Sequence, residues 1–326
     1  MIVLTWAMAA PSSIAAQQAR GARIIEHSGY SDCIELFNDS TRIVLCPAVG
    51  GRILEYSLNG KNSLYLDPKQ TGWLWTGQAP IDPSGGRFDI GPEMTIPRHP
   101  KLWLGRWQGQ ITGPRAARLI SEEDDATGVR LIRDFELDKS SSKLVCKQNV
   151  RNISNQTRYW CHWSRTLALG GGVCVIPLTE PSRFPNKYVM YGPGSCINFR
   201  PSDPNIRVRD GFLEIIGTPA NPKLGMDSYA GWLCYLTTND LMFVKRFPTY
   251  PDRVYSEVAG LTISIWYYKD IMCELEPIGP MEKIAPGKSA SFTETWWLVP
   301  FEFPAQGTNV DLDRLAKVVE THARSS

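Results

Sequence analysis

One histidine on a strand-like segment has the side-chain chemistry and the spacing for proton transfer. In residues 158–164, Trp160, His162 and Ser164 occupy alternate positions. Alternate side chains of a β-strand share one face, so these three lie together. An imidazole on a cleft wall could donate or accept a proton. Histidines on strands also serve structural roles, and both interpretations of His162 stay open at this level.

A second strand-like segment supplies carboxylates by the same alternation. Glu274 and Glu276 fall on one face, opposite Cys273 and Leu275. We expect the apolar pair in the core and the carboxylates in a cleft or in solvent. A carboxylate beside an imidazole would complete an acid–base pair.

The elements that must position these residues are short strands separated by Gly, Pro, Asn and Asp turns, from residue 24 to residue 299. Predicted hairpins join 52–58 to 63–66 through Asn59-Gly60, 129–137 to 143–153, and 231–237 to 241–247, with further strands at 261–268, 271–275 and 289–299. Only residues 310–323 have helical spacing. The pattern predicts an all-β fold, a large antiparallel β-sandwich with one C-terminal helix, as a single domain over residues 21–326.

Two long stretches rich in Pro and Gly interrupt this pattern, at residues 67–100 and 177–205. Loops of this length are uncommon in compact domains and are usually functional. We expect them to form the rim of a ligand cleft.

Composition narrows the class of ligand. Lys and Arg number 35 against 33 Asp and Glu, without a run of five basic residues, so nucleic acid is not an expected partner. Eleven tryptophans contribute to a 10% aromatic content. Large rings serve as core residues or as platforms for the apolar face of a sugar.

The N-terminus and the cysteines bear on the cellular compartment. Residues 1–20 begin with an uncharged apolar stretch, a possible signal peptide or apolar tail. We expect export to the periplasm or the extracellular space, or a cytoplasmic location if this stretch is no signal. We expect no membrane span. The eight cysteines form no CxxC pair, which favours buried free thiols, while export would favour disulfides.

Five sequence blocks occur in an order that resembles a known family. They are Pro80–Gly86 with Ile90–Pro92, Ile96–Trp107 around His99, Asn152–His162, Cys273–Pro277 with its Glu-Pro pair, and Ile284–Trp296. Together they resemble the aldose 1-epimerase (galactose mutarotase) superfamily, particularly its hexose-6-phosphate 1-epimerase branch. The sequence departs from the family pattern at Pro100, where the family has Gly, and at Trp103, where it has Arg.

The resemblance implies a role for each matching residue. Glu276 matches the general base that takes the anomeric hydroxyl proton, and His162 matches the general acid that donates to the ring oxygen. His99 matches the second histidine, which orients or polarises that oxygen. The resemblance implies neither a metal nor an organic cofactor. Glu274 lies on the same face as Glu276, but only Glu276 precedes a proline.

Side chains around these residues are candidates for contact with the sugar. They are Arg87, Trp103, Trp107, Trp163 and Arg165. The expected ligand is a small sugar or the sugar end of a glycan. Three functions remain open: an aldose 1-epimerase, a catalytically silent carbohydrate-binding domain on the same fold, and an exported structural or interaction domain.

Overall fold

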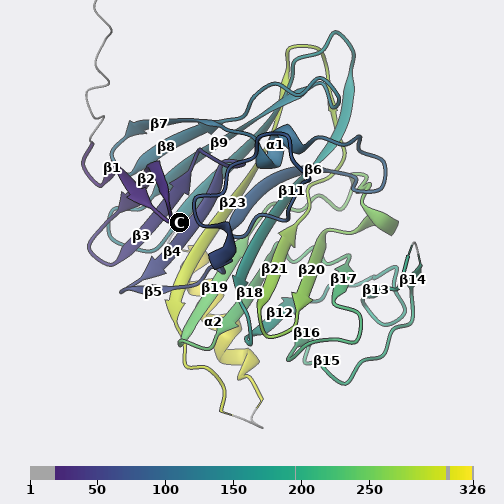
Figure 1. Ribbon diagram of the computed structural model, residues 1–326. Coiled ribbons are helices and arrows are strands. Elements are labelled where there is room, and N and C mark those ends of the chain that lie inside the picture. The colour runs from purple at the N-terminus through teal and green to yellow at the C-terminus, as the bar shows by residue number, and fades with distance from the viewer. Residues whose placement is uncertain (1–18, 195, 306–308, 325–326) are drawn as a thin grey trace, which may run out of the picture.

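Two large antiparallel β-sheets pack face to face in the computed structural model, whose described residues are 19–194, 196–305 and 309–324 (Figure 1). The larger sheet has 13 strands and the smaller has 10. Within each sheet, every pair of named strands is antiparallel, which confirms the predicted antiparallel β-sandwich. The two sheets bury one shared apolar core, so residues from both ends of the chain stabilise the same interior.

The larger sheet contains, in spatial order, β1 (Ala22–His27), β2 (Tyr30–Phe37), β3 (Thr41–Cys46), β4 (Arg52–Leu58), β6 (Gly86–Gly91), β11 (Arg158–Leu169), β21 (Met272–Pro277), β20 (Ile263–Tyr268), β17 (Lys223–Met226), β13 (Val189–Tyr191) and β14 (Ile197–Asn198). Two short strands join it at the side, β5 (Lys61–Asn62) on β4 and β22 (Glu282–Ile284) on β11.

The smaller sheet contains, in spatial order, β15 (Ile206–Arg209), β16 (Phe212–Ile215), β12 (Val173–Pro177), β18 (Trp232–Thr237), β19 (Leu241–Arg246), β23 (Ser289–Pro300), β10 (Leu144–Asn152), β9 (Val129–Leu137), β8 (Ala116–Ile120) and β7 (Gln108–Gly113). The helices are the short α1 (Pro100–Leu104) and the longer α2 (Leu312–Arg324).

Alternation along the strands decides which side chains meet between the sheets. On β19, Phe243 points inward and packs against Tyr56 and Trp296, with ring centroids 5.6 and 5.2 Å apart. Its neighbour Val244 points outward and belongs to a separate cluster. The smaller sheet is therefore apolar on both faces, which requires a cover on its outer side.

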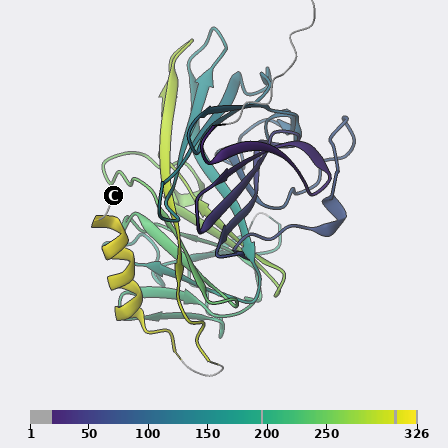
Figure 2. The same ribbon diagram turned by 90° about the vertical axis from the view of Figure 1, so that its left-hand side faces the viewer.

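Helix α2 provides that cover. Leu312, Leu315 and Val319 recur at helical spacing and are buried in one cluster with Val244 and Trp297 of the smaller sheet. Figure 2 shows the helix lying along the outer side of these strands. The helix predicted over residues 310–323 is confirmed within a residue or two at each end.

Several predicted strands are confirmed and three predictions are wrong, one of them the loop expected over 177–205, which contains β13 and β14. The hairpins β9–β10 and β18–β19 form as expected. Asn59 and Gly60, whose φ angles are both positive, do form a turn, but it joins β4 to β5 and not to residues 63–66. Residues 63–66 are not a strand and make only one isolated bridge, Leu64 to Ala168. Strand β6 lies inside the stretch 67–100 that the sequence assigned entirely to a loop.

The apolar residues 1–18 lie outside the described part of the chain, so the expected signal segment falls there. Within the described residues, no helix has the length and apolarity needed to cross a bilayer. The cysteines in that part are free thiols, and all but the exposed Cys196 are buried.

Candidate functional site

Three adjacent strands of the larger sheet place polar side chains on the face that points away from the shared core. This face carries Arg87 and Asp89 from β6, Trp163 and Arg165 from β11, and Glu274 and Glu276 from β21. The β6–β11 register sets Arg165 opposite Arg87 and Trp163 opposite Asp89. Because side chains alternate, the intervening residues Cys273 and Leu275 enter the core as predicted.

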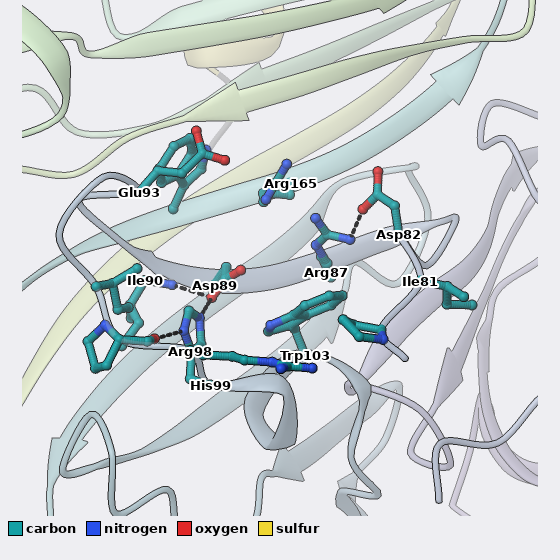
Figure 3. Close-up of a pocket in the computed structure, with 14 residues that line it drawn as sticks. Ile81, Asp82, Arg87, Asp89, Ile90, Glu93, Arg98, His99, Trp103 and Arg165 are labelled. Atoms are coloured by element: carbon teal, nitrogen blue, oxygen red, sulfur yellow. Dashed lines mark hydrogen bonds and ion pairs between the residues drawn. The ribbon is translucent and has the colours of Figure 1, made fainter. Parts of the chain in front are cut away.

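A cavity of about 340 Å³ opens above these strands. We call it the His99 pocket. It is lined by Pro80, Ile81, Asp82, Arg87, Asp89, Ile90, Glu93, Ile96, Pro97, Arg98, His99, Trp103, Trp163 and Arg165. Strands β6 and β11 form its floor, while the segment after β6 and helix α1 form a wall (Figure 3). The stretch 67–100 thus supplies the expected rim.

His99 lies at the start of α1 and is held by two acceptors. Its Nε2 is 2.8 Å from Asp89 Oδ1, and its Nδ1 is 2.7 Å from the Pro97 carbonyl oxygen (Figure 3). Both nitrogens therefore donate, which requires the imidazolium form. Burial alone would lower the pKa of His99, but the Asp89 charge and hydrogen bond outweigh it and raise that pKa above 6.5.

Arg87 joins the pocket wall to its floor. Its guanidinium forms an ion pair with Asp82 and lies 3.9 Å from Glu274 Oε1. The same guanidinium stacks over the Trp103 ring at 5.3 Å (Figure 3). Trp103 therefore presents a held aromatic ring to the pocket.

Arg165 has its main partner on the neighbouring strand. Its Nε donates to Glu274 Oε1 at 3.0 Å, and its Nη2 donates to Oε2 at 3.4 Å. This bidentate pair fixes the guanidinium plane, because two parallel bonds define it. Glu274 is fully buried in this pair, which fits a structural partner better than a free base.

Glu276 lies one layer below the pocket. Its Oε2 accepts the Trp163 indole N–H at 2.6 Å, and its Oε1 has no partner among the described residues. Burial, and to a smaller extent the nearby Glu274 charge, raise the pKa of Glu276 to about 8. At neutral pH this carboxyl is protonated.

Lys223 of β17 lies over the Trp163 ring, whose N–H bonds Glu276. Its Nζ bonds Glu93 Oε2 at 2.6 Å and lies 5.3 Å from the centre of the Trp163 ring. Burial lowers the pKa of Lys223, but Glu276 and Glu93 together raise it above its ordinary value. The positive charge of Lys223 in turn lowers the pKa of Glu276 and so limits the rise caused by burial.

His162 is on the opposite side of the sheet from the pocket, which corrects its expected place beside the ligand. Its ring stacks between Phe88 and Phe292, at centroid distances of 5.7 and 5.6 Å, and it is 0% exposed. Trp160, His162 and Ser164 do share a face, but that face points into the core. Burial lowers the pKa of His162 to about 4, so the ring is neutral there.

Trp107 is likewise a core residue and not a wall of the pocket. It is almost fully buried, and its indole N–H donates to the Leu102 carbonyl at 2.9 Å. The ring packs so closely on Gly51 that a Cβ there would lie 2.5 Å from it. The spacing between His99 and Trp107 suggested a site residue, but Trp107 instead bonds the last turn of α1 through Leu102.

The residues predicted from the sequence therefore fall into two groups: those at the pocket, and those in the core, which are His162 and Trp107. Arg87, His99, Trp103, Trp163 and Arg165 all line the pocket, and Glu276 contacts it through Trp163. Asp89, Asp82 and Lys223 were missed. Asp89 could have been found by the alternation rule, since it is two residues from Arg87 on one strand.

Comparison with known proteins gives the fold. No protein-family model and no curated protein matches the chain. Among solved structures, the Slr1438 protein of Synechocystis sp. PCC 6803 superposes with a TM-score of 0.56 at 15% identity, covering 85% of this chain and 99% of that one. A candidate aldose 1-epimerase of Escherichia coli K12 gives 0.56 at 12% identity, with 82% and 98% covered.

A galactose mutarotase-like protein of Lactobacillus casei ATCC 334 gives a TM-score of 0.55 at 10% identity, with 82% of this chain and 100% of that chain covered. These structures are matched over nearly their whole length, so the likeness extends across both sheets. At identities this low, the likeness shows a shared fold and not a shared chemistry. The chain has the galactose mutarotase-like fold.

Proposed function

We propose that this chain binds a sugar in the His99 pocket, as a carbohydrate-binding protein. One observation carries this proposal: a cavity of about 340 Å³ joins an aromatic wall, Trp103, to a floor of held charges. A sugar ring has apolar C–H faces and a rim of hydroxyls, and such a cavity complements both. Candidate aldose 1-epimerase and galactose mutarotase-like proteins share the fold, which agrees with a sugar ligand.

The polar groups of the floor are already oriented. Asp89 and Asp82 can accept from hydroxyls, while Arg87 and Arg165 can donate to them. Each is fixed by an ion pair within the site. Binding therefore costs little side-chain ordering, which favours affinity.

Binding without catalysis fits the arrangement of the acid and base better than turnover does. The matching general acid, His162, is neutral and on the core side of β11. Glu276 is protonated at neutral pH and covered by Trp163. A base must be deprotonated and within reach of the substrate proton.

A second function, sugar 1-epimerisation, is favoured by one specific observation. Glu276 has an unpartnered Oε1 and a pKa near 8, and a pKa near working pH suits proton transfer. In this function Glu276 takes the anomeric proton once the Trp163 ring moves, and the His99 imidazolium polarises the ring oxygen. The wild type would then speed polarimetric equilibration of freshly dissolved α-anomers. Glu276→Gln would slow it by about 10²–10⁴-fold.

The binding proposal is tested by titrating a panel of mono- and disaccharides while recording tryptophan fluorescence. Asp89→Asn removes an acceptor in the pocket, and Trp232→Phe, at the α2 side of the smaller sheet, is the matched control. We expect saturable binding by wild type and by the control, and weaker binding by Asp89→Asn. Equal responses from all three proteins would overturn the pocket assignment.

A further inference from the structure

Two buried cysteines face each other at one end of the larger sheet. The β2–β3 ladder ends with Ile34 opposite Leu45, and continuing this register by one residue sets Cys33 opposite Cys46. Both side chains are 0% exposed and belong to one apolar cluster. The Cys33 thiol donates to the His27 carbonyl oxygen at 3.9 Å. Directly opposed cysteines on neighbouring strands are close enough for a disulfide after small movements.

A buried cation lies beside this pair. Arg52 is opposite Cys46 in the β3–β4 register and is 1% exposed. Its guanidinium donates to the Val49 and Ser84 carbonyls, the Gln70 side chain and the Tyr30 hydroxyl, all of which are uncharged. A buried cation without an opposite charge is costly. A thiolate at Cys46 would supply that charge.

The groups around Cys46 stabilise its thiolate. The neighbouring Cys33 thiol is the main cause that lowers the pKa of Cys46 below 9.0, and Arg52 and the backbone N–H groups of Val49 and Ala48 add to it against the effect of burial. The pKa of Cys33 is raised by the neighbouring Cys46 and by burial. Cys46 is therefore the nucleophile of the pair, and Cys33 is the thiol that stays protonated.

A separate cavity of about 250 Å³ reaches Arg52 from the surface. Tyr30 and Leu54 line it and also pack in the apolar cluster of the two cysteines. It is distinct from the His99 pocket, with which it shares none of its lining residues. The cavity gives a small molecule a route to within one side-chain layer of the thiols.

We propose that Cys46 and Cys33 are a redox-active pair that a hydroperoxide oxidises to a disulfide. The Cys46 thiolate attacks one peroxide oxygen, the O–O bond breaks, and hydroxide leaves to take up a proton as water. Cys46 is then a sulfenic acid. Cys33 loses its proton and attacks the Cys46 sulfur, the S–O bond breaks, and a second water leaves. Two thiols and one hydrogen peroxide give one disulfide and two waters.

The other cysteines provide internal controls. Cys174 and Cys273 also lie close together, across the two sheets, but burial, the neighbouring Cys174 and the Glu274 carboxylate all raise the pKa of Cys273. Cys196 is exposed. Thiolate character thus selects Cys46, whereas solvent exposure alone would select Cys196.

The test uses the reduced full chain with Cys196→Ser as background. It is treated with stoichiometric hydrogen peroxide, denatured, alkylated and mapped by peptide mass spectrometry. We expect a linked Cys33–Cys46 peptide pair that dithiothreitol releases. Cys33→Ser should stop at a Cys46 sulfenic acid that dimedone traps, and Cys46→Ser should leave Cys33 alkylatable.

Arg52 is tested by the rate of oxidation. Arg52→Gln should slow Cys46 oxidation by about tenfold, while Arg52→Lys, which keeps the charge, should slow it less. Circular dichroism checks that each variant is folded, and the two cysteine variants decide the matter if Arg52→Gln is not. Full alkylation of Cys33 and Cys46 after peroxide, or linkage of Cys174 to Cys273 instead, overturns the proposal.

Discussion

The indole N–H of Trp163 bonds Glu276 Oε2 at 2.6 Å, and Trp163 lines the pocket while Glu276 does not. The ring is therefore the boundary between the ligand cavity and the buried carboxyl. This boundary keeps Glu276 out of water and protonated. It also means that any chemistry by Glu276 requires a movement of Trp163.

The two glutamates of β21 should differ sharply in their effect on stability. Glu274→Gln removes the charge that pairs with Arg165, and breaking a buried pair costs about 3–5 kcal/mol. Glu276→Gln replaces a neutral acid with a neutral amide of similar shape in the folded chain, and it removes the group that the unfolded wild type ionises at pH 7, so this variant should be at least as stable as wild type. Urea unfolding at pH 7 measures both, and equal losses would contradict the assigned protonation states.

Glu276 should also make stability fall as pH rises. Between its ordinary pKa of 4.5 and its folded value of about 8, the unfolded chain ionises this group while the folded chain keeps its proton. Stability then falls with rising pH by up to about 1.4 kcal/mol per pH unit. The difference in unfolding free energy between wild type and Glu276→Gln, measured by urea unfolding from pH 5 to 8, isolates this slope. A difference that does not change with pH would refute the raised pKa.

His162 should act in the opposite direction, on the acid side. Its folded pKa is about 4 against an ordinary 6.5, so below pH 6.5 the unfolded chain binds a proton that the folded chain does not. Stability is lost as pH falls through this window. His162→Phe keeps a ring between Phe88 and Phe292. Between pH 6.5 and 5 its free energy of unfolding should fall by about 2 kcal/mol less than that of wild type. Parallel losses in both proteins would place His162 in water.

The histidines can be followed one by one by NMR, since the chain has only four. His99 should titrate above 6.5 because of Asp89, and His162 near 4. Asp89→Asn should lower the pKa of His99, because the charge that holds its proton is lost. His162 is the control, and its titration should not move.

Trp103 within α1 and Trp107 just after it should separate binding from stability. Trp103→Ala removes the aromatic wall and should weaken sugar binding by about tenfold, with a small effect on unfolding. Trp107→Ala empties a core position and should cost about 3–5 kcal/mol of stability. Fluorescence titration and urea unfolding of both variants distinguish the roles, and a binding loss confined to Trp107→Ala would reverse them.

Much of the architecture could be predicted from the sequence because the information is local. Asn59-Gly60 specifies a tight turn, and the spacing of Leu312, Leu315 and Val319 specifies one face of a helix. Strand β6 was hidden because it is short and lies between proline-rich segments. Its assignment depends on pairing with β11, more than 60 residues away in sequence, which no local pattern reveals.

For the site, alternation predicted which residues share a face but not which face meets the core. His162 and Trp163 are neighbours, and a strand turned by one residue exchanges their environments. Phe88 and Phe292, on two other strands, decide that the imidazole is the buried one. The family resemblance carried His162 into the site by position, whereas packing placed it in the core.

A crystal structure with the tightest-binding sugar of the panel tests the central claim most directly. We predict a sugar ring against Trp103, with hydroxyls bonded to at least one of Asp89, Arg87 and Arg165. Glu276 should remain beneath Trp163 if the chain only binds. A sugar bound elsewhere on the molecule, or a pocket still free of sugar at saturating concentration, would contradict the assignment of the His99 pocket as a sugar site.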